Sequence, residues 1–285
     1  EGVAVQLGAA ISHRVGRILK IEDAPKLMLI TGIAAGFAGL FRTPFAATAF
    51  ALEVLTAGRL EHRALLPAGT AALCASVTSG LLGLEKFCFG IEVQPEWDAG
   101  LLLRLIVLGL AFGLAGLAFT FLLGKCKDEA KSRLKDPVLR CFVMGAALSV
   151  LLLALYSGRY CGLGTNLISL SLEGGNIYGW DWLLKLILTV LTLSAGFQGG
   201  EVTPLFSIGA SLGAFLAGTL GIPAAFCAAL GYAAVFGSAT NTLIAPIFIA
   251  AEVFSWPIIP YAALTCALAY AVNRGLSIYS GQRSR

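Results

Sequence analysis

Apolar segments alternate along the whole chain with short polar stretches that contain glycine or proline. The segments cover residues 3–19, 25–41, 44–57, 64–84, 99–124, 137–156, 163–172, 179–195, 204–219, 223–236, 240–255 and 257–273. Several of them are shorter than the roughly 20 residues that a helix needs to cross a bilayer. Short apolar segments broken by glycine and proline predict helices that end part-way across a membrane, with their ends meeting at a buried site.

The composition indicates a membrane environment. Of the 285 residues, 58% are hydrophobic and only 13% are charged. A soluble domain of this length would expose far more polar surface. The 34 glycines allow membrane helices to approach one another closely. We therefore expect residues 1–285 to form a single all-α polytopic transmembrane domain in the lipid bilayer, with short, broken and re-entrant helices.

Charged residues gather in two of the polar stretches. Basic residues occupy 124–136 (Lys125, Lys127, Lys131, Arg133 and Lys135), and acidic residues occupy 85–98 (Glu85, Glu92, Glu96 and Asp98). Cytoplasmic loops of membrane proteins are enriched in lysine and arginine. This predicts that 124–136 is cytoplasmic and that 85–98 faces outward. A nucleic-acid site is the alternative explanation of these basic residues, but membrane topology explains them better. We therefore expect no nucleic-acid partner.

Two pairs of glutamates indicate an internal repeat. Glu1 and Glu53 are 52 positions apart, and Glu201 and Glu252 are 51 positions apart. Two local matches accompany these pairs: Leu7-Gly8-Ala9-Ala10 with Ile208-Gly209-Ala210-Ser211, and Phe50-Ala51-Leu52-Glu53-Val54 with Ile249-Ala250-Ala251-Glu252-Val253. Chance similarity among apolar helices is the alternative. An inverted repeat places the binding site between the two halves, near the membrane midplane.

The repeat also predicts the organisation of the domain. Residues 136–285 would be the second repeat, and residues 1–135 would be the remainder of the first. The first repeat has no counterpart of residues 163–200 ahead of Glu1. We therefore expect the chain to be the C-terminal portion of a longer transporter.

Acidic side chains and helix starts coincide in the sequence. Glu1 and Glu201 each lie beside glycine just before a long apolar run, where a carboxylate is costly unless a cavity, a proton or an ion compensates it. Thr203-Pro204 and Thr43-Pro44 are typical helix starts, with threonine as the cap and proline at the first helical position. The N–H groups of a helix start bind anions. The pattern predicts an anion site with an acid beside it.

An intramembrane hydrolase that uses Glu1 and Glu201 as an acid/base pair is an alternative from another class. The sequence contains no His-Glu-x-x-His, a motif that would support such chemistry. His13, His62 and the seven cysteines lack the spacing of metal ligands. We therefore expect no enzymatic activity, no cofactor and no bound metal.

Four motifs, in the right order from residue 1 to residue 280, resemble the CLC family of anion channels and transporters. Residues 1–8 are similar to the end of its Gly-Arg-Glu-Gly-x-x-Val-Gln motif, and residues 36–53 resemble its Gly-x-x-Ala-x-Phe-x-x-Pro motif that ends in glutamate. Residues 200–204 occupy the place of its Gly-x-Phe-x-Pro motif. Residues 277–280 resemble a C-terminal segment whose tyrosine points at the central anion. The resemblance implies an inverted-repeat fold and a homodimer with one pore per subunit.

Departures from the family pattern favour its fluoride-exporting branch. Val202 stands where the family has its filter phenylalanine, and Glu201 matches the acid that this branch carries just before it. Val54 stands where chloride/proton exchangers usually have a second acid. The resemblance therefore implies a fluoride/proton antiporter of the bacterial inner membrane. A chloride channel or a chloride/proton exchanger of the same family is the alternative.

The resemblance also implies roles for individual residues. Glu1 would be the gating glutamate, which carries the proton and competes with the anion. The anion would be bound and selected by Gly2, Val3, Glu201, Val202, Thr203 and Tyr279. Alternatively, Glu201 or Thr203 only caps a helix, and Tyr279 is an interfacial aromatic residue. We expect Glu53 and Glu252 to be hydrogen-bonded structural acids at helix ends.

Overall fold

The chain folds into a bundle of α-helices, several of which are short. The computed structural model describes residues 2–18, 24–91, 95–273, 275–279 and 281–282, and these form twelve α-helices, three short 3-10 helices and no strand. The α-helices are α1 (Gly2–Ile18), α2 (Ala24–Phe41), α3 (Pro44–Glu53), α4 (Leu65–Leu81), α5 (Ala99–Arg133), α6 (Pro137–Ala154), α7 (Thr165–Glu173), α8 (Asp181–Ala195), α9 (Val202–Leu220), α10 (Ala224–Thr240), α11 (Ile244–Val253) and α12 (Ile259–Val272). Each predicted apolar segment overlaps one of these helices, so the expected all-α fold is confirmed.

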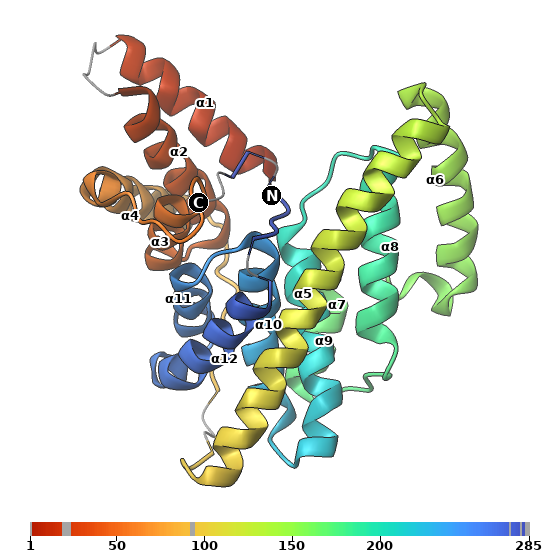
Figure 1. The fold of residues 1–285 in the computed structure, drawn as a ribbon. Helices are drawn as coiled ribbons and strands as arrows, with labels where there is room; N and C mark the ends of the chain where they lie inside the picture. The colour runs from red at the N-terminus through yellow and green to blue at the C-terminus, as the bar shows by residue number, and fades with distance from the viewer. Residues whose placement is uncertain (1, 19–23, 92–94, 274, 280, 283–285) are drawn as a thin grey trace.

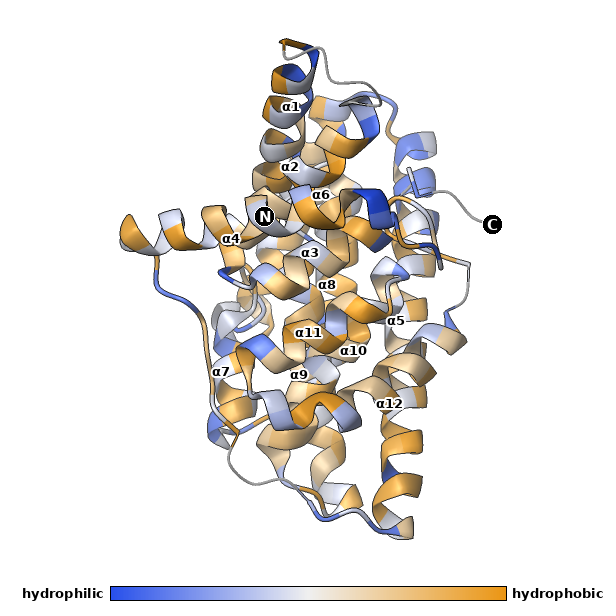
Figure 2. Ribbon diagram, turned by 90° about the vertical axis from the view of Figure 1, so that its left-hand side faces the viewer, coloured by the Kyte–Doolittle hydropathy of each residue, from blue (hydrophilic) through white to orange (hydrophobic). Residues whose placement is uncertain are grey.

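The helices are arranged around one long diagonal element. Figure 1 shows α1 to α4 on one side, α6 and α8 on the other, and α5 running between them beside α10 and α12. Four described helices are long and apolar enough to cross a membrane: His62–Leu81, Ala99–Arg133, Pro137–Ala154 and Val202–Leu220. Figure 2 shows that hydrophobic colours cover most of the helices, whereas hydrophilic colours gather at helix ends and in connecting segments. The chain is a multi-pass membrane protein.

Helix α5 is longer than the apolar pattern predicts. The predicted segment ends at residue 124, but the helix continues through the basic stretch to Arg133. In this extension, the Glu129 carboxylate accepts a 2.5 Å hydrogen bond from Arg133, four residues later, and such pairs support a helix outside the membrane. Asp98 caps the other end by accepting from the Leu101 N–H. The acidic and the basic stretch therefore lie at opposite ends of one helix.

Glycines bring two helix pairs into backbone contact. A Cβ on Gly8 of α1 would lie 2.3 Å from the carbonyl oxygen of Gly32 on α2. A Cβ on Gly209 of α9 would lie 2.0 Å from the carbonyl oxygen of Gly231 on α10. Only glycine allows such close approach of membrane helices. The α1–α2 and α9–α10 pairs are therefore packed in the same way, at matching positions of the proposed repeat.

Glu53 joins the end of α3 to the start of α11. Its carboxylate accepts hydrogen bonds of 2.9 to 3.2 Å from the backbone N–H groups of Leu243, Ile244 and Ala245. The side chain is buried. The first N–H groups of a helix have no partner within the helix, and in a membrane they find no water either. Glu53 therefore provides acceptors that α11 cannot provide for itself.

Glu252 makes the reciprocal contact from α11 to α3. Its carboxylate accepts a 2.7 Å hydrogen bond from the Ala46 N–H, in the first turn of α3. It is also buried. Each of these two short helices thus carries, at its own end, the acid that caps the start of the other. Both glutamates are hydrogen-bonded acids at helix ends, as expected from the sequence. The repeat boundary at residues 135 and 136, which separates α5 from α6, stays a prediction.

We expect replacement of Glu53 by alanine to destabilise the fold strongly, because three backbone N–H groups would lose their acceptor. One unsatisfied buried donor typically costs 1–3 kcal/mol. With three N–H groups affected, we expect the free energy of unfolding to fall by about 3 kcal/mol. Thermal unfolding in detergent measures it. Glu173→Ala, at the exposed end of α7, is the matched control and should change stability by less than about 0.5 kcal/mol. Equal unfolding midpoints for both variants would contradict the capping role.

Candidate anion site

A cavity of about 500 Å³ lies where the starts of α1 and α9 meet the C-terminal segment. Its described lining consists of Gly2, Val5, Gln6, Ala9, Leu29, Ile33, Phe37, Phe41, Phe50, Val54, Leu55, Glu201, Val202, Tyr279, Gly281 and Gln282. Most of these side chains are apolar. Glu201 is the one charged residue among them. The cavity therefore combines an apolar wall with a few polar groups, as sites for small ligands generally do.

The start of α9 brings Glu201 to the cavity. Glu201 is the residue before the helix, and its side chain makes no capping hydrogen bond to the helix. Its carboxylate lies 4.0 Å from the ammonium group of Lys127, which belongs to the basic extension of α5. Both side chains are partly exposed, and a pair of this kind contributes little to stability. The ion pair instead places a cation beside the acid at the edge of the cavity.

The end of α10 holds the segment that carries Tyr279. The Ile278 N–H donates to the Ala239 carbonyl at 3.0 Å, and the Gln282 side-chain amide donates to the Thr240 carbonyl at 3.1 Å. These carbonyls lie in the last turn of α10, where the helix has no N–H group left to donate to them. The Tyr279 ring packs edge-on against Phe50, with 6.0 Å between ring centroids. The C-terminal segment is thus fixed across the cavity by the backbone of α10.

Three phenylalanine rings, of Phe37, Phe41 and Phe50, form part of the cavity wall. Phe37 packs against Phe41 on α2 and against Phe50 on α3, with centroid separations of 4.6 and 5.0 Å. The Phe41 ring also meets Phe206 of α9 edge to face at 6.0 Å. Rings packed at these distances attract one another beyond their buried area. The wall therefore links the first half of the chain to α9.

The structure brings together four of the residues that the sequence assigns to the anion site. Gly2, Glu201, Val202 and Tyr279 all line the cavity. Thr203 is buried in the first turn of α9 and is not part of the lining. The side chain of Val3 is 62% exposed and also lies outside it. Glu1, the expected proton carrier, lies outside the described residues, and the residue that follows it reaches the cavity.

Sequence reasoning missed the lysine beside Glu201. It treated Lys127 only as part of a cytoplasmic topology signal. The position of Lys127 depends on the continuation of α5 beyond the apolar segment, which brings the basic stretch over the start of α9. The spacing of Glu129 and Arg133, four residues apart, was the available sign that this stretch is helical.

The lining supplies hydrogen-bond donors for an anion. Within the described wall these are the Tyr279 hydroxyl and the side-chain amides of Gln6 and Gln282. Backbone N–H groups at the starts of α1 and α9 add the positive ends of two helix dipoles. A small anion can be held here without a fixed positive charge in direct contact.

Comparison with known proteins agrees with an anion site. Residues 1–274 match the family described as voltage gated chloride channel. A chloride/fluoride channel protein of Pseudomonas syringae pv. tomato is 38% identical over 293 residues, covering 99% of this chain and 64% of the relative. The H(+)/Cl(-) exchange transporter ClcA of Citrobacter koseri is 25% identical over 235 residues, covering 80% of this chain and 49% of the relative. The chain thus spans between half and two thirds of these relatives.

Two solved structures have the same fold. The crystal structure of a CLC-type fluoride/proton antiporter is 51% identical, with a TM-score of 0.97 over 100% of this chain and 72% of the other. A slow cyanobacterial Cl-/H+ antiporter is 20% identical, with a TM-score of 0.76 over 94% of this chain and 66% of the other. The second likeness concerns the fold alone. Together they support the inverted-repeat CLC fold that the motifs implied.

We expect Tyr279→Phe to weaken anion binding in the cavity while leaving the fold intact, because it removes one hydroxyl donor. The loss should be about 1 kcal/mol, the net contribution of an ordinary hydrogen bond. Calorimetric titration of purified protein with halide salts measures it. Tyr178→Phe, at an exposed tyrosine distant in sequence, is the control and should bind like the parent. If both variants bind with the parent's affinity, the Tyr279 hydroxyl does not contact the anion.

Proposed function

The chain belongs to the voltage gated chloride channel family, and on this premise we propose that it moves fluoride across the membrane in exchange for protons. One observation carries the proposal: the cavity at the starts of α1 and α9 is lined by Glu201, in a chain that closely matches a solved fluoride/proton antiporter. The family consists of channels and transporters, which gives no support to the hydrolase alternative.

The chemistry of Glu201 suits fluoride better than chloride. A carboxylate repels every halide, but a protonated carboxyl group is a hydrogen-bond donor. Fluoride is the smallest halide and the strongest hydrogen-bond acceptor, so it benefits most from such a donor. While Glu201 is ionised, Lys127, 4.0 Å away, balances its charge, and once protonated the carboxyl group can donate to fluoride. The acid and the lysine together would favour the halide that accepts hydrogen bonds best.

Chloride transport is the second candidate, since relatives are described as chloride/fluoride channel and H(+)/Cl(-) exchange transporter. Val54 argues against a chloride/proton exchanger. It lines the cavity at the position where such exchangers usually carry an acid for the proton. A valine there cannot take up a proton. This absence of a second acid leaves Glu1 as the proton carrier in the proposed cycle.

We further propose that the protein is a homodimer in the inner membrane of a bacterium. The bacterial sources of the relatives support the location. The family resemblance supports the dimer, with one cavity in each subunit. An apolar groove of about 390 Å³ between α3, α4 and α11 is a surface that helices of a second subunit can fill.

Glu201→Ala should reduce the preference for fluoride over chloride, because it removes the carboxyl group whose hydrogen bond favours fluoride, the stronger acceptor. We expect roughly a tenfold loss, the worth of one charge-assisted hydrogen bond. Efflux of both ions from liposomes containing purified protein measures it. Lys127→Met is the companion variant, since it removes the ion pair but keeps the carboxyl group. Unchanged selectivity in Glu201→Ala would leave this residue with a structural role only.

Glu1→Gln should uncouple fluoride from protons. Glutamine has nearly the shape of glutamate but cannot take up or release a proton, so a proton gradient should no longer drive fluoride uphill. The variant should either stop fluoride transport or let fluoride pass only down its own gradient. Fluoride accumulation in liposomes under an imposed pH gradient is the measurement, and Glu96→Gln in the exposed 95–98 segment is the control. Persistent proton-driven accumulation would move the proton role to another residue, with Glu201 the first to test.

A further inference from the structure

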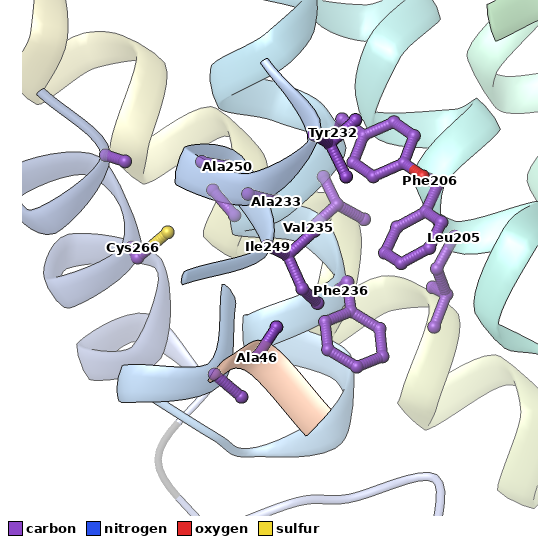
Figure 3. Packing of buried hydrophobic residues seen from close by; sticks show 14 of the residues in the cluster. Ala46, Leu205, Phe206, Tyr232, Ala233, Val235, Phe236, Ile249, Ala250 and Cys266 are labelled. Carbon is purple, nitrogen blue, oxygen red and sulfur yellow. The ribbon is translucent and has the colours of Figure 1, made fainter. Parts of the chain in front are cut away.

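A second, much smaller cavity lies behind the phenylalanine wall. Its volume is about 20 Å³, and its lining comprises Phe37, Phe41, Thr43, Phe87, Phe206 and Tyr232 together with two aliphatic side chains of α11. Phe37 and Phe41 also line the larger cavity. The two spaces are therefore separated by shared rings. Figure 3 shows Phe206 and Tyr232 side by side in this part of the core.

Thr43 places an unpartnered hydroxyl in this small cavity. The residue is 2% exposed, and within the described part of the chain its Oγ1 has no hydrogen-bond partner. Thr43 precedes α3 but does not cap it through its side chain. Thr48, one turn later, donates its hydroxyl to the Pro44 carbonyl at 2.7 Å. Because burial of an unpaired hydroxyl is costly, the Thr43 hydroxyl points to a ligand that accepts its proton.

The size of the cavity limits that ligand to a single small species. A space of this size holds about one water-sized group, which fluoride matches better than any larger halide. The surrounding aromatic rings carry positive partial charge at their edges. One water molecule fits the same space, so the volume excludes larger halides but does not distinguish fluoride from water.

The charges around the α2–α3 turn are compatible with an anion. Glu252 caps the start of α3 with its carboxylate, which by itself would repel one. Arg42, directly before Thr43, is half-buried, and its guanidinium group donates to the Leu84 carbonyl at 2.9 Å. Lys86 is close enough to interact with the charge of Glu252.

We propose that this cavity is a second fluoride station, in which the Thr43 hydroxyl donates a hydrogen bond to the ion. The proposal rests on the proposed fluoride transport and extends it beyond the larger cavity. The two stations are separated by Phe37 and Phe41, so fluoride passes between them when these rings turn. Phe87 forms the outer wall and is 46% exposed, which places the station between the larger cavity and the surface of the 82–91 segment.

The test compares Thr43→Val, which keeps the shape but removes the hydroxyl, with Thr43→Ser, which keeps the hydroxyl. Thr48→Val is the control, because it removes a neighbouring hydroxyl that already has a partner. Equilibrium dialysis of purified protein against sodium fluoride, read with a fluoride electrode, counts bound ions. Fluoride efflux from liposomes gives the rate. Size-exclusion profiles establish that each variant is folded.

Thr43→Val should bind about one fluoride ion fewer per subunit than the parent, and its fluoride efflux should slow on the order of tenfold, as expected from loss of one hydrogen bond to a charged group. Thr43→Ser and Thr48→Val should resemble the parent. If Thr43→Val binds as many fluoride ions as the parent and transports them as fast, the proposed station is wrong. A cavity that holds only water would give this result. Failure of the proposed function is a separate result, since the parent itself would then show no fluoride efflux.

Discussion

Every helix that starts inside a membrane exposes N–H groups that neither water nor lipid can satisfy, and this constraint organises the centre of the molecule. Two helices of ten residues each, α3 and α11, meet it by exchanging acids: Glu53 caps α11, and Glu252 caps α3. Neither helix could start in the apolar core without the acid of the other. The exchange therefore locks the first half of the chain to the second, and other contacts between the halves build on this arrangement.

The same residue type serves the opposite purpose at the start of α9. Glu201 makes no capping hydrogen bond to its helix and faces the larger cavity. Where glutamates seal a helix start, as in α3 and α11, the carboxylate accepts from backbone N–H groups that an ion could otherwise use. Where the acid turns away towards Lys127, the positive end of the helix remains available to an anion. The difference between a structural acid and a transport acid thus lies in whether the carboxylate already accepts backbone N–H groups.

The cavity depends on this division of roles. The caps fix α3 and α11, so Phe50 and Val54, near the end of α3, form a firm side of the cavity. The last turn of α10 gives its spare carbonyls to the C-terminal segment and thereby positions Tyr279. The phenylalanine wall then separates the larger cavity from the small one at Thr43. A rigid framework of satisfied backbone groups surrounds a few polar groups left for the ion.

The sequence by itself determined the helices, their order and the motifs that resemble an anion transporter, because apolar runs and Gly/Pro breaks are local properties. It also placed Glu53 and Glu252 at helix ends. Only the tertiary structure decided which helix start each acid serves, since Glu53 reaches N–H groups 190 to 192 positions away. The pairing of Lys127 with Glu201 and the unpartnered hydroxyl of Thr43 were likewise invisible in the sequence. Hydrogen-bond partners in an apolar core are set by which segments meet, and no local pattern records that.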